Sequence, residues 1–80
     1  MKLWLISQTV NDGYDTYDSA VVAAETKEEA RMTHPSGNNW NGEMGTYDSW
    51  CDAKDVSVEF VGIAKDGTKA GIICASFNAG

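Results

Sequence analysis

The pattern of apolar residues along the chain predicts β-strands at Lys2–Gln8, Val56–Ala64 and Gly71–Phe77, and in Val56–Ala64 apolar and polar positions alternate as in a half-buried strand. A fourth segment, Ser19–Ala24, is a short apolar run between polar turn residues and predicts a buried strand. In the first strand Leu3 and Leu5 share one side, while Trp4 and Ile6 share the other. Because both sides are apolar, this strand is central, or its sheet is covered on both faces.

One helix is predicted directly after the second strand. Thr26 precedes Glu29 by three residues, which is the spacing of a capping box, and acidic residues in the first turn suit the helix dipole. Pro35 keeps His34 out of the α region, so the helix ends near Thr33. A helix of about two turns must pack against the sheet to be stable. Its candidate apolar contacts are Ala23, Ala30 and Met32.

Two turns favour hairpins on either side of the helix. Asn11-Asp12-Gly13 lies in the polar loop Val10–Asp18, and Asp66-Gly67 lies between the last two predicted strands. The expected fold is α+β in the order β-β-α-β-β. It has a mainly antiparallel four-stranded sheet, one short helix on one face and a long loop that contains aromatic residues. Nothing local in the sequence decides which strands are central.

Size and charge restrict the partners of this chain. Its 80 residues predict a single small α+β domain over positions 1–80, marginally stable or helped by self-association, for which a homodimer is one form. Six Lys and Arg against twelve Asp and Glu give a net charge of −6, which disfavours direct binding to nucleic acid or to anionic membranes and favours a basic partner. We expect a cytoplasmic protein, because the start of the chain lacks a signal-peptide pattern. Two reduced cysteines fit that compartment.

The first candidate site is the loop between the first two strands. It clusters carboxylates with tyrosines, and its candidate contact residues are Asp12, Tyr14, Asp15, Tyr17 and Asp18. The spacing of the carboxylates is not that of an EF-hand, so we do not favour a calcium site. Two interpretations remain open: a solvated hairpin loop, or an interaction surface whose carboxylates meet Lys or Arg of a partner.

The second candidate site is the long segment Ser36–Asp55, whose candidate contact residues are Trp40, Tyr47, Asp48 and Trp50. An irregular segment of this length in a small domain is functional or disordered, and the aromatic residues favour an ordered one. Trp40 and Trp50 could close one face of the sheet, or could form a binding hot spot with acidic neighbours. They could also line a small-ligand pocket together with Asn38 and Asn39.

The third candidate is His34, the only histidine. With Cys51 and Cys74 it could form a mixed zinc site, but the ligand spacing of a zinc motif is absent. Ser36 lies nearby, yet no nucleophile-elbow, P-loop or dinucleotide-binding motif is present. We therefore expect no enzyme, no metal and no cofactor, with His34 as a polar residue at the end of the helix.

The segments MKLWLISQTVNDGYDTYDSAVVAAETKEEA and THP, together with the closing DVSVEFVGIA and ASFNAG, resemble a group of small uncharacterised accessory proteins of bacteriophages and prophages. The resemblance covers both ends of the chain and weakens through Ser36–Asp55. It carries no catalytic motif. It implies a protein that binds and blocks a host protein, as anti-CRISPR proteins do.

The leading functional prediction is a non-enzymatic inhibitor of a bacterial defence system. Its acidic and aromatic surface would occupy a basic, nucleic-acid-binding surface of a host defence protein. Carboxylates gathered on one face would support this prediction, and scattered ones would count against it. One alternative is a sponge for a nucleotide signal, which needs basic or backbone N–H contacts to phosphate. The other is a virion or structural accessory protein.

Overall fold

The computed structural model describes residues 1–45 and 48–78. Their elements are β1 (Lys2–Ser7), β2 (Thr16–Ala24), α1 (Lys27–Arg31), a 3₁₀ turn η1 (Ala53–Asp55), β3 (Ser57–Ile63) and β4 (Gly71–Asn78). All pairings in the four-stranded sheet are antiparallel. The predicted α+β class, the four strands and the single short helix are therefore confirmed.

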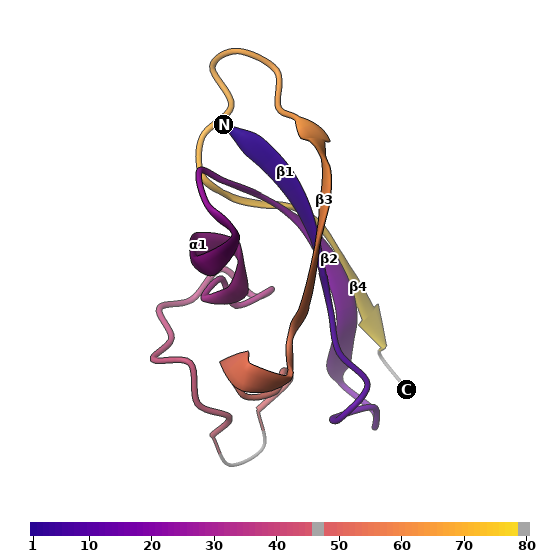
Figure 1. Cartoon of the computed structure of the whole chain (residues 1–80). Helices are drawn as coiled ribbons and strands as arrows, with labels where there is room; N and C mark the ends of the chain where they lie inside the picture. The colour runs from indigo at the N-terminus through magenta and orange to yellow at the C-terminus, as the bar shows by residue number, and fades with distance from the viewer. Residues whose placement is uncertain (46–47, 79–80) are drawn as a thin grey trace.

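The order of the strands in the sheet is β3-β1-β2-β4. The predicted hairpin between β1 and β2 is confirmed, but the one between the last two strands is wrong, because β3 and β4 lie at opposite edges. The turn itself forms: Gly67 has a positive φ of 87°, and the Thr68 N–H donates to the Lys65 carbonyl at 3.1 Å. The chain then crosses the end of the sheet before β4 begins (Figure 1). An Asp-Gly turn thus reverses the chain here without pairing the strands beside it.

Strand β1 is central, which is one of the two possibilities that its apolar sides left open, and within residues 1–45 and 48–78 the sheet is covered on one face only. Helix α1, the long segment after it and η1 all lie on the same side of the sheet (Figure 1). On that side Trp4 and Ile6 of β1 are buried, whereas Leu3 and Leu5 on the opposite side are half-buried. The protein is therefore a two-layer structure with a partly apolar outer sheet face.

The start of α1 follows the capping pattern. The Thr26 hydroxyl accepts from the Glu29 N–H at 3.1 Å and also lies 3.2 Å from the Glu29 carboxylate. The Glu29 side chain therefore bonds the hydroxyl and not the Thr26 N–H. The helix ends at Arg31, slightly earlier than predicted. Of its candidate apolar contacts, Ala30 is fully buried, while Met32 is 43% exposed.

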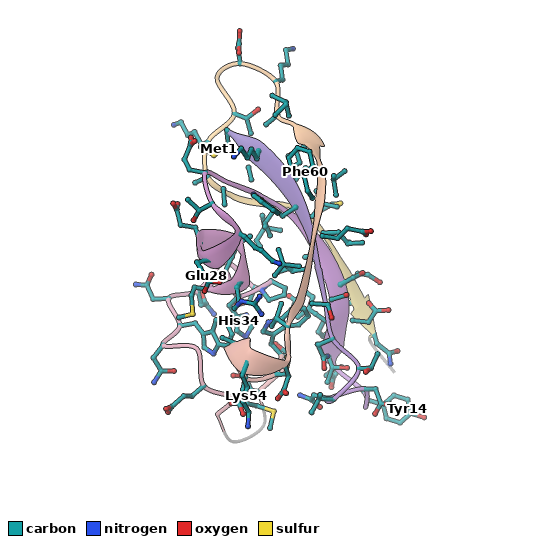
Figure 2. The ribbon with its side chains drawn as sticks, viewed as in Figure 1. Met1, Tyr14, Glu28, His34, Lys54 and Phe60 are labelled. Carbon is teal, nitrogen blue, oxygen red and sulfur yellow. The ribbon has the colours of Figure 1, made fainter. Side chains whose placement is uncertain are left out.

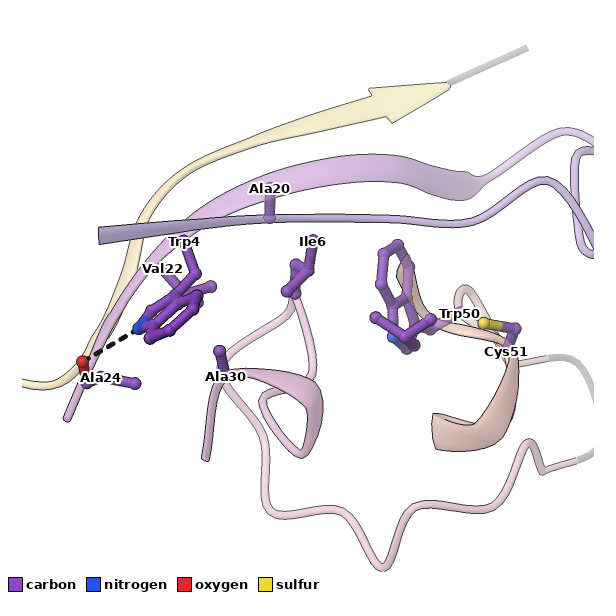
Figure 3. Close-up of a cluster of buried hydrophobic side chains, with 9 residues drawn as sticks. Trp4, Ile6, Ala20, Val22, Ala24, Ala30, Trp50 and Cys51 are labelled. Carbon is purple, nitrogen blue, oxygen red and sulfur yellow. Dashed lines mark hydrogen bonds between the residues drawn. The ribbon is translucent and has the colours of Figure 1, made fainter. Parts of the chain in front are cut away.

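The core lies between the sheet and the segments that cover it. Figure 3 shows Trp4 and Ile6 projecting from β1 towards Ala30 of α1, and Trp50 reaching the same layer from the long segment. The Trp4 indole N–H donates to the Ala24 carbonyl at 3.1 Å. Trp50 is completely buried, and its indole N–H has no hydrogen-bond partner among the described residues. The long segment thus supplies core material that so short a helix cannot provide.

Candidate protein-binding surface

The loop between β1 and β2 is held in one conformation by a polar network. The buried Gln8 side chain donates to the carbonyls of Asn11 and Tyr17 at 2.7 and 2.8 Å and accepts from the Asn11 N–H at 2.7 Å. The Thr16 hydroxyl donates to the Gly13 carbonyl at 2.6 Å. Asp15 adopts a left-handed conformation with φ of 59°, which Asp tolerates better than most residues. The loop is therefore ordered before any partner arrives.

The same loop is tied to the long segment. The Asn11 amide donates to the carbonyls of Asp48 and Trp50 at 2.9 and 2.8 Å, and the Tyr17 N–H donates to the Ser49 carbonyl at 2.8 Å. Within the long segment, the Ala53 N–H donates to the Gly42 carbonyl at 2.8 Å. These bonds bring the two candidate sites to one end of the molecule, the lower end in Figures 1 and 2.

This end, which we call the acidic end, holds most of the negative charge. Its seven carboxylates are accompanied by Lys54 and by the guanidinium of Arg31, which bonds the Val56 carbonyl at 2.7 Å and also pairs with Glu28 at 3.5 Å. With this Arg31–Glu28 pair included, the net charge of the acidic end is −6, and the remaining four carboxylates are matched by the remaining four Lys residues. The entire formal charge of the chain therefore lies at the acidic end. Its carboxylates belong to Asp12, Asp15, Asp18, Glu43, Asp48, Asp52 and Asp55.

The residues predicted for the first site occupy two kinds of position. Asp12, Asp15 and Asp18 are exposed, and the Tyr14 side chain is 79% exposed at the tip of the loop (Figure 2). Tyr17 instead faces inward. Its ring centroid lies 4.8 Å from that of Phe77 and 6.4 Å from that of His34. Four of the five residues thus form a surface, and the fifth supports it from beneath.

The residues predicted for the second site differ widely in how much of each is exposed. Trp50 is fully buried and cannot contact a partner, so its assignment as a contact residue is wrong, and it closes the sheet instead. Trp40 is half-buried against the core, with its indole N–H donating to the Glu43 carbonyl at 2.8 Å. Tyr47 lies outside the described residues. Asp48 belongs to a buried hydrogen-bond cluster.

That cluster joins Asp48 to the end of the helix. The Ser36 N–H donates to His34 Nδ1 at 3.1 Å, so Nδ1 is an acceptor and His34 Nε2–H donates to Asp48 Oδ1 at 2.8 Å. Asp48 also accepts from the N–H groups of Gly45 and Trp50. Burial alone would raise the pKa of this carboxyl, but the bond from His34 and the backbone bonds together hold the pKa below its usual range. His34 and Asp48 therefore tie the long segment to α1.

Ser36, His34 and Asp48 form a hydrogen-bonded line of three side chains, since Ser36 Oγ lies 2.8 Å from His34 Nδ1. This arrangement resembles the catalytic triad of a serine hydrolase. Acyl transfer also needs N–H donors free to bind an oxyanion. The nearest amides are already used: Ser36 N–H bonds His34, Gly37 N–H bonds the His34 carbonyl, and Asn38 N–H bonds Ser36 Oγ. We therefore interpret the line as a support for the loop.

Two shallow pockets adjoin the cluster, with volumes of about 260 and 320 Å³. Both are lined by His34, Asn38, Asn39 and Trp40, of which Asn38, Asn39 and Trp40 belong to the small-ligand alternative; Trp50, its other aromatic residue, lines neither pocket. Neither lining contains Lys or Arg, and Asp48 borders the larger pocket. Phosphate would meet a carboxylate there instead of a cation, which disfavours a nucleotide as the ligand.

Cys51 is buried and Cys74 is exposed, and both thiols are free. Across residues 1–45 and 48–78, no group of three His, Cys, Asp or Glu side chains is arranged to hold a metal ion. Within the same residues, no helix is long and apolar enough to cross a membrane. Comparison with protein-family models, curated proteins and solved structures finds no match to this chain.

Sequence reasoning missed two residues that organise this surface, Gln8 and Asn11, and proposed Asp48 as a contact residue only. The Asn11 side chain bonds carbonyls 37 and 39 residues away, and no spacing in the sequence links it to them. The one local signal was the polar Gln8 at the end of an otherwise apolar strand. A buried amide in that position needs partners, and here the loop between β1 and β2 supplies them.

Proposed function

We propose that this protein is a non-enzymatic inhibitor whose acidic end binds a basic, nucleic-acid-binding surface of a bacterial defence protein. The observation that carries the proposal is the segregation of charge: a net −6 at one end and zero over the rest of the molecule. Such an asymmetry orients the protein in the field of a basic partner and accelerates encounter. It also lets the carboxylates compete with phosphates for the same Lys and Arg side chains.

The fixed conformation of the loop between β1 and β2 strengthens the proposal. Binding by a flexible acidic loop would lose conformational entropy, whereas the Gln8 and Asn11 bonds have already fixed this loop. The exposed Tyr14 ring stands among the carboxylates and offers a large contact area with few rotamers. The acidic end thus combines steering charge with an aromatic anchor. The resemblance to phage accessory proteins suggests the defence setting of the target.

The proposal is tested by affinity capture from a lysate of a defence-bearing bacterium, with bound proteins and small molecules identified by mass spectrometry. The test variant carries Asp12→Asn, Asp15→Asn and Asp18→Asn. The matched control carries Glu25→Gln, Glu59→Gln and Asp66→Asn, which removes the same charge from the neutral part of the molecule. All six side chains are exposed.

We expect the wild type and the control to retain a nucleic-acid-binding protein that elutes at high salt. The test variant should bind it about ten- to a hundredfold more weakly, as expected for three interfacial charges. Equal loss in both variants would mean that only net charge matters, and the proposed surface would be wrong. A co-purifying nucleotide in place of a protein would favour the sponge.

A further inference from the structure

The outer edge of β4 is unpaired in the described chain, and from Cys74 to Asn78, beyond the irregularity at Ile73, it lacks the usual protection of an edge strand. Its eight residues, GIICASFN, contain no charge and no proline. The other edge strand, β3, carries Glu59 and a bulge near Val61, and the carbonyl of Val56 just before it is bonded by the Arg31 guanidinium at 2.7 Å. Proteins normally protect exposed edges with such features, because an unprotected edge pairs with another strand.

The peptide groups available on this edge can be identified. The Asn78 carbonyl accepts from the Asp15 N–H at 2.6 Å and therefore points towards β2. The irregularity of β4 lies at Ile73, so the strand is regular from Cys74 to Asn78 and its peptide groups alternate in direction. The N–H and C=O groups of Ala75 and Phe77 consequently point outward. Phe77 also leaves 46% of its side chain exposed.

We propose that a second copy of this chain pairs with β4 in antiparallel fashion, joining two four-stranded sheets into one. With the two-fold axis at Ser76, Ala75 of one copy lies opposite Phe77 of the other. Both residues then exchange N–H···O=C bonds with their partners, and no outward peptide group between them is left unpaired. Ala75 pairs with buried Ala20, and Phe77 packs on Tyr17, so both side chains lie on the helix-bearing face. The Phe77 ring would therefore be covered by the Ala75 methyl group of the other copy.

The charge distribution selects a second copy in this orientation. The Asn78 end of β4 adjoins the acidic end, whereas its Gly71 end adjoins the turn that carries Lys65 and Lys69. Antiparallel pairing directs the lysine turn of each copy towards the acidic end of the other. Opposite charges therefore attract each other at both of the two symmetry-related contacts. Parallel pairing would place two ends of −6 side by side. This inference is independent of the proposed function.

The first test is sedimentation equilibrium of the full chain, with Ala75→Pro as the variant. Proline removes an outward N–H and leaves the bonds between β2 and β4 in place, so the fold should persist, as circular dichroism would verify. We expect the wild type to dimerise and Ala75→Pro to raise the dissociation constant at least tenfold. A wild type that is monomeric at about 1 mM would overturn the proposal. The proposal would also be overturned if the dimer persisted in Ala75→Pro but was lost in Val21→Lys. That result would place the contact between the two copies on the outer face of the sheet.

A second test uses charge and keeps β4 unchanged. One variant carries Lys65→Glu and Lys69→Glu, and the other carries Asp12→Lys, Asp15→Asn, Asp18→Lys and Glu43→Lys, four exposed positions whose change makes the acidic end net positive. Each alone should dimerise at least tenfold more weakly than the wild type, because like charges then meet at both contacts. An equimolar mixture restores opposite charges at both contacts and should recover dimers of near wild-type affinity. If the mixture dimerises no better than the separate variants, the antiparallel arrangement is wrong.

Discussion

The substitution Asp48→Asn tests whether the acidic end depends on the His34–Asp48 pair. The side chain of Asp48 is 17% exposed and accepts three hydrogen bonds, from His34 at 2.8 Å, Trp50 at 3.1 Å and Gly45 at 3.2 Å. An asparagine oxygen can keep the bonds from His34 and Trp50, but its NH₂ group would face the Gly45 N–H. One bond is therefore lost and two lose their charged acceptor.

Hydrogen bonds to charged groups contribute about 1.5–3 kcal/mol and neutral ones about 1 kcal/mol, so the loss of the Gly45 bond alone costs about 2 kcal/mol, and we expect at least this loss of stability. In a domain of this size that corresponds to a fall in Tm of roughly 8–16 °C. The assay is thermal unfolding by circular dichroism at pH 7. Asp12→Asn is the matched control, since it makes the same chemical change at an exposed position and should leave Tm unchanged.

The pH dependence supplies a second signature. The folded-state pKa of Asp48 lies below its unfolded value, so its stabilising contribution is present above about pH 4 and is lost as the pH falls. The difference in Tm between the wild type and Asp48→Asn should therefore narrow in acid. A variant that melts within about 2 °C of the wild type at pH 7 would refute the reasoning, as would a gap that does not change with pH.

Three further predictions concern the core, the helix and the thiols. Trp4→Phe should destabilise the fold by about 1 kcal/mol more than Trp50→Phe in urea unfolding, because only the Trp4 indole N–H has a partner to lose; equal losses would contradict this. Thr26→Ala should cost about 1 kcal/mol by the same measurement, while Thr26→Ser keeps the cap and should cost less; a neutral Thr26→Ala would mean that the cap is not needed. Burial, reinforced by the charges of Asp55 and Asp52, raises the pKa of the Cys51 thiol to about 11. A thiol reagent at neutral pH should therefore modify the native chain once, at the exposed Cys74, and should not modify the Cys74→Ser variant. Rapid modification of native Cys74→Ser would show that Cys51 is accessible.

Local patterns in the sequence were enough to place the secondary structure. The pattern of apolar residues located the strands to within a few residues, the Thr26–Glu29 spacing located the start of α1, and Pro35 limited its length. These features depend on side-chain direction and backbone conformation over a few neighbouring residues. The two apolar sides of β1 left two possibilities, a central strand or a sheet covered on both faces, and the strand pairing shows the first.

The same local reasoning failed where the partner of a residue lies far along the chain. The Asp66-Gly67 turn looks like a hairpin from its own residues, but pairing with β1 and β2 places β3 and β4 at opposite edges. Trp50 could have stood on the surface or in the core, and the short helix left a gap over the sheet that its indole fills.

The sequence by itself determined how much charge the protein carries, which segments form strands and helix, and that aromatic residues occupy the long segment. Only the tertiary structure decided where that charge lies, because the bonds of Asn11 and Tyr17 to the carbonyls of residues 48–50 join two acidic loops that the sequence keeps apart. It also decided that β4 ends the sheet and leaves an uncharged edge. Charge and strand propensity are properties of residues, whereas their segregation and exposure result from long-range contacts, which no local pattern encodes.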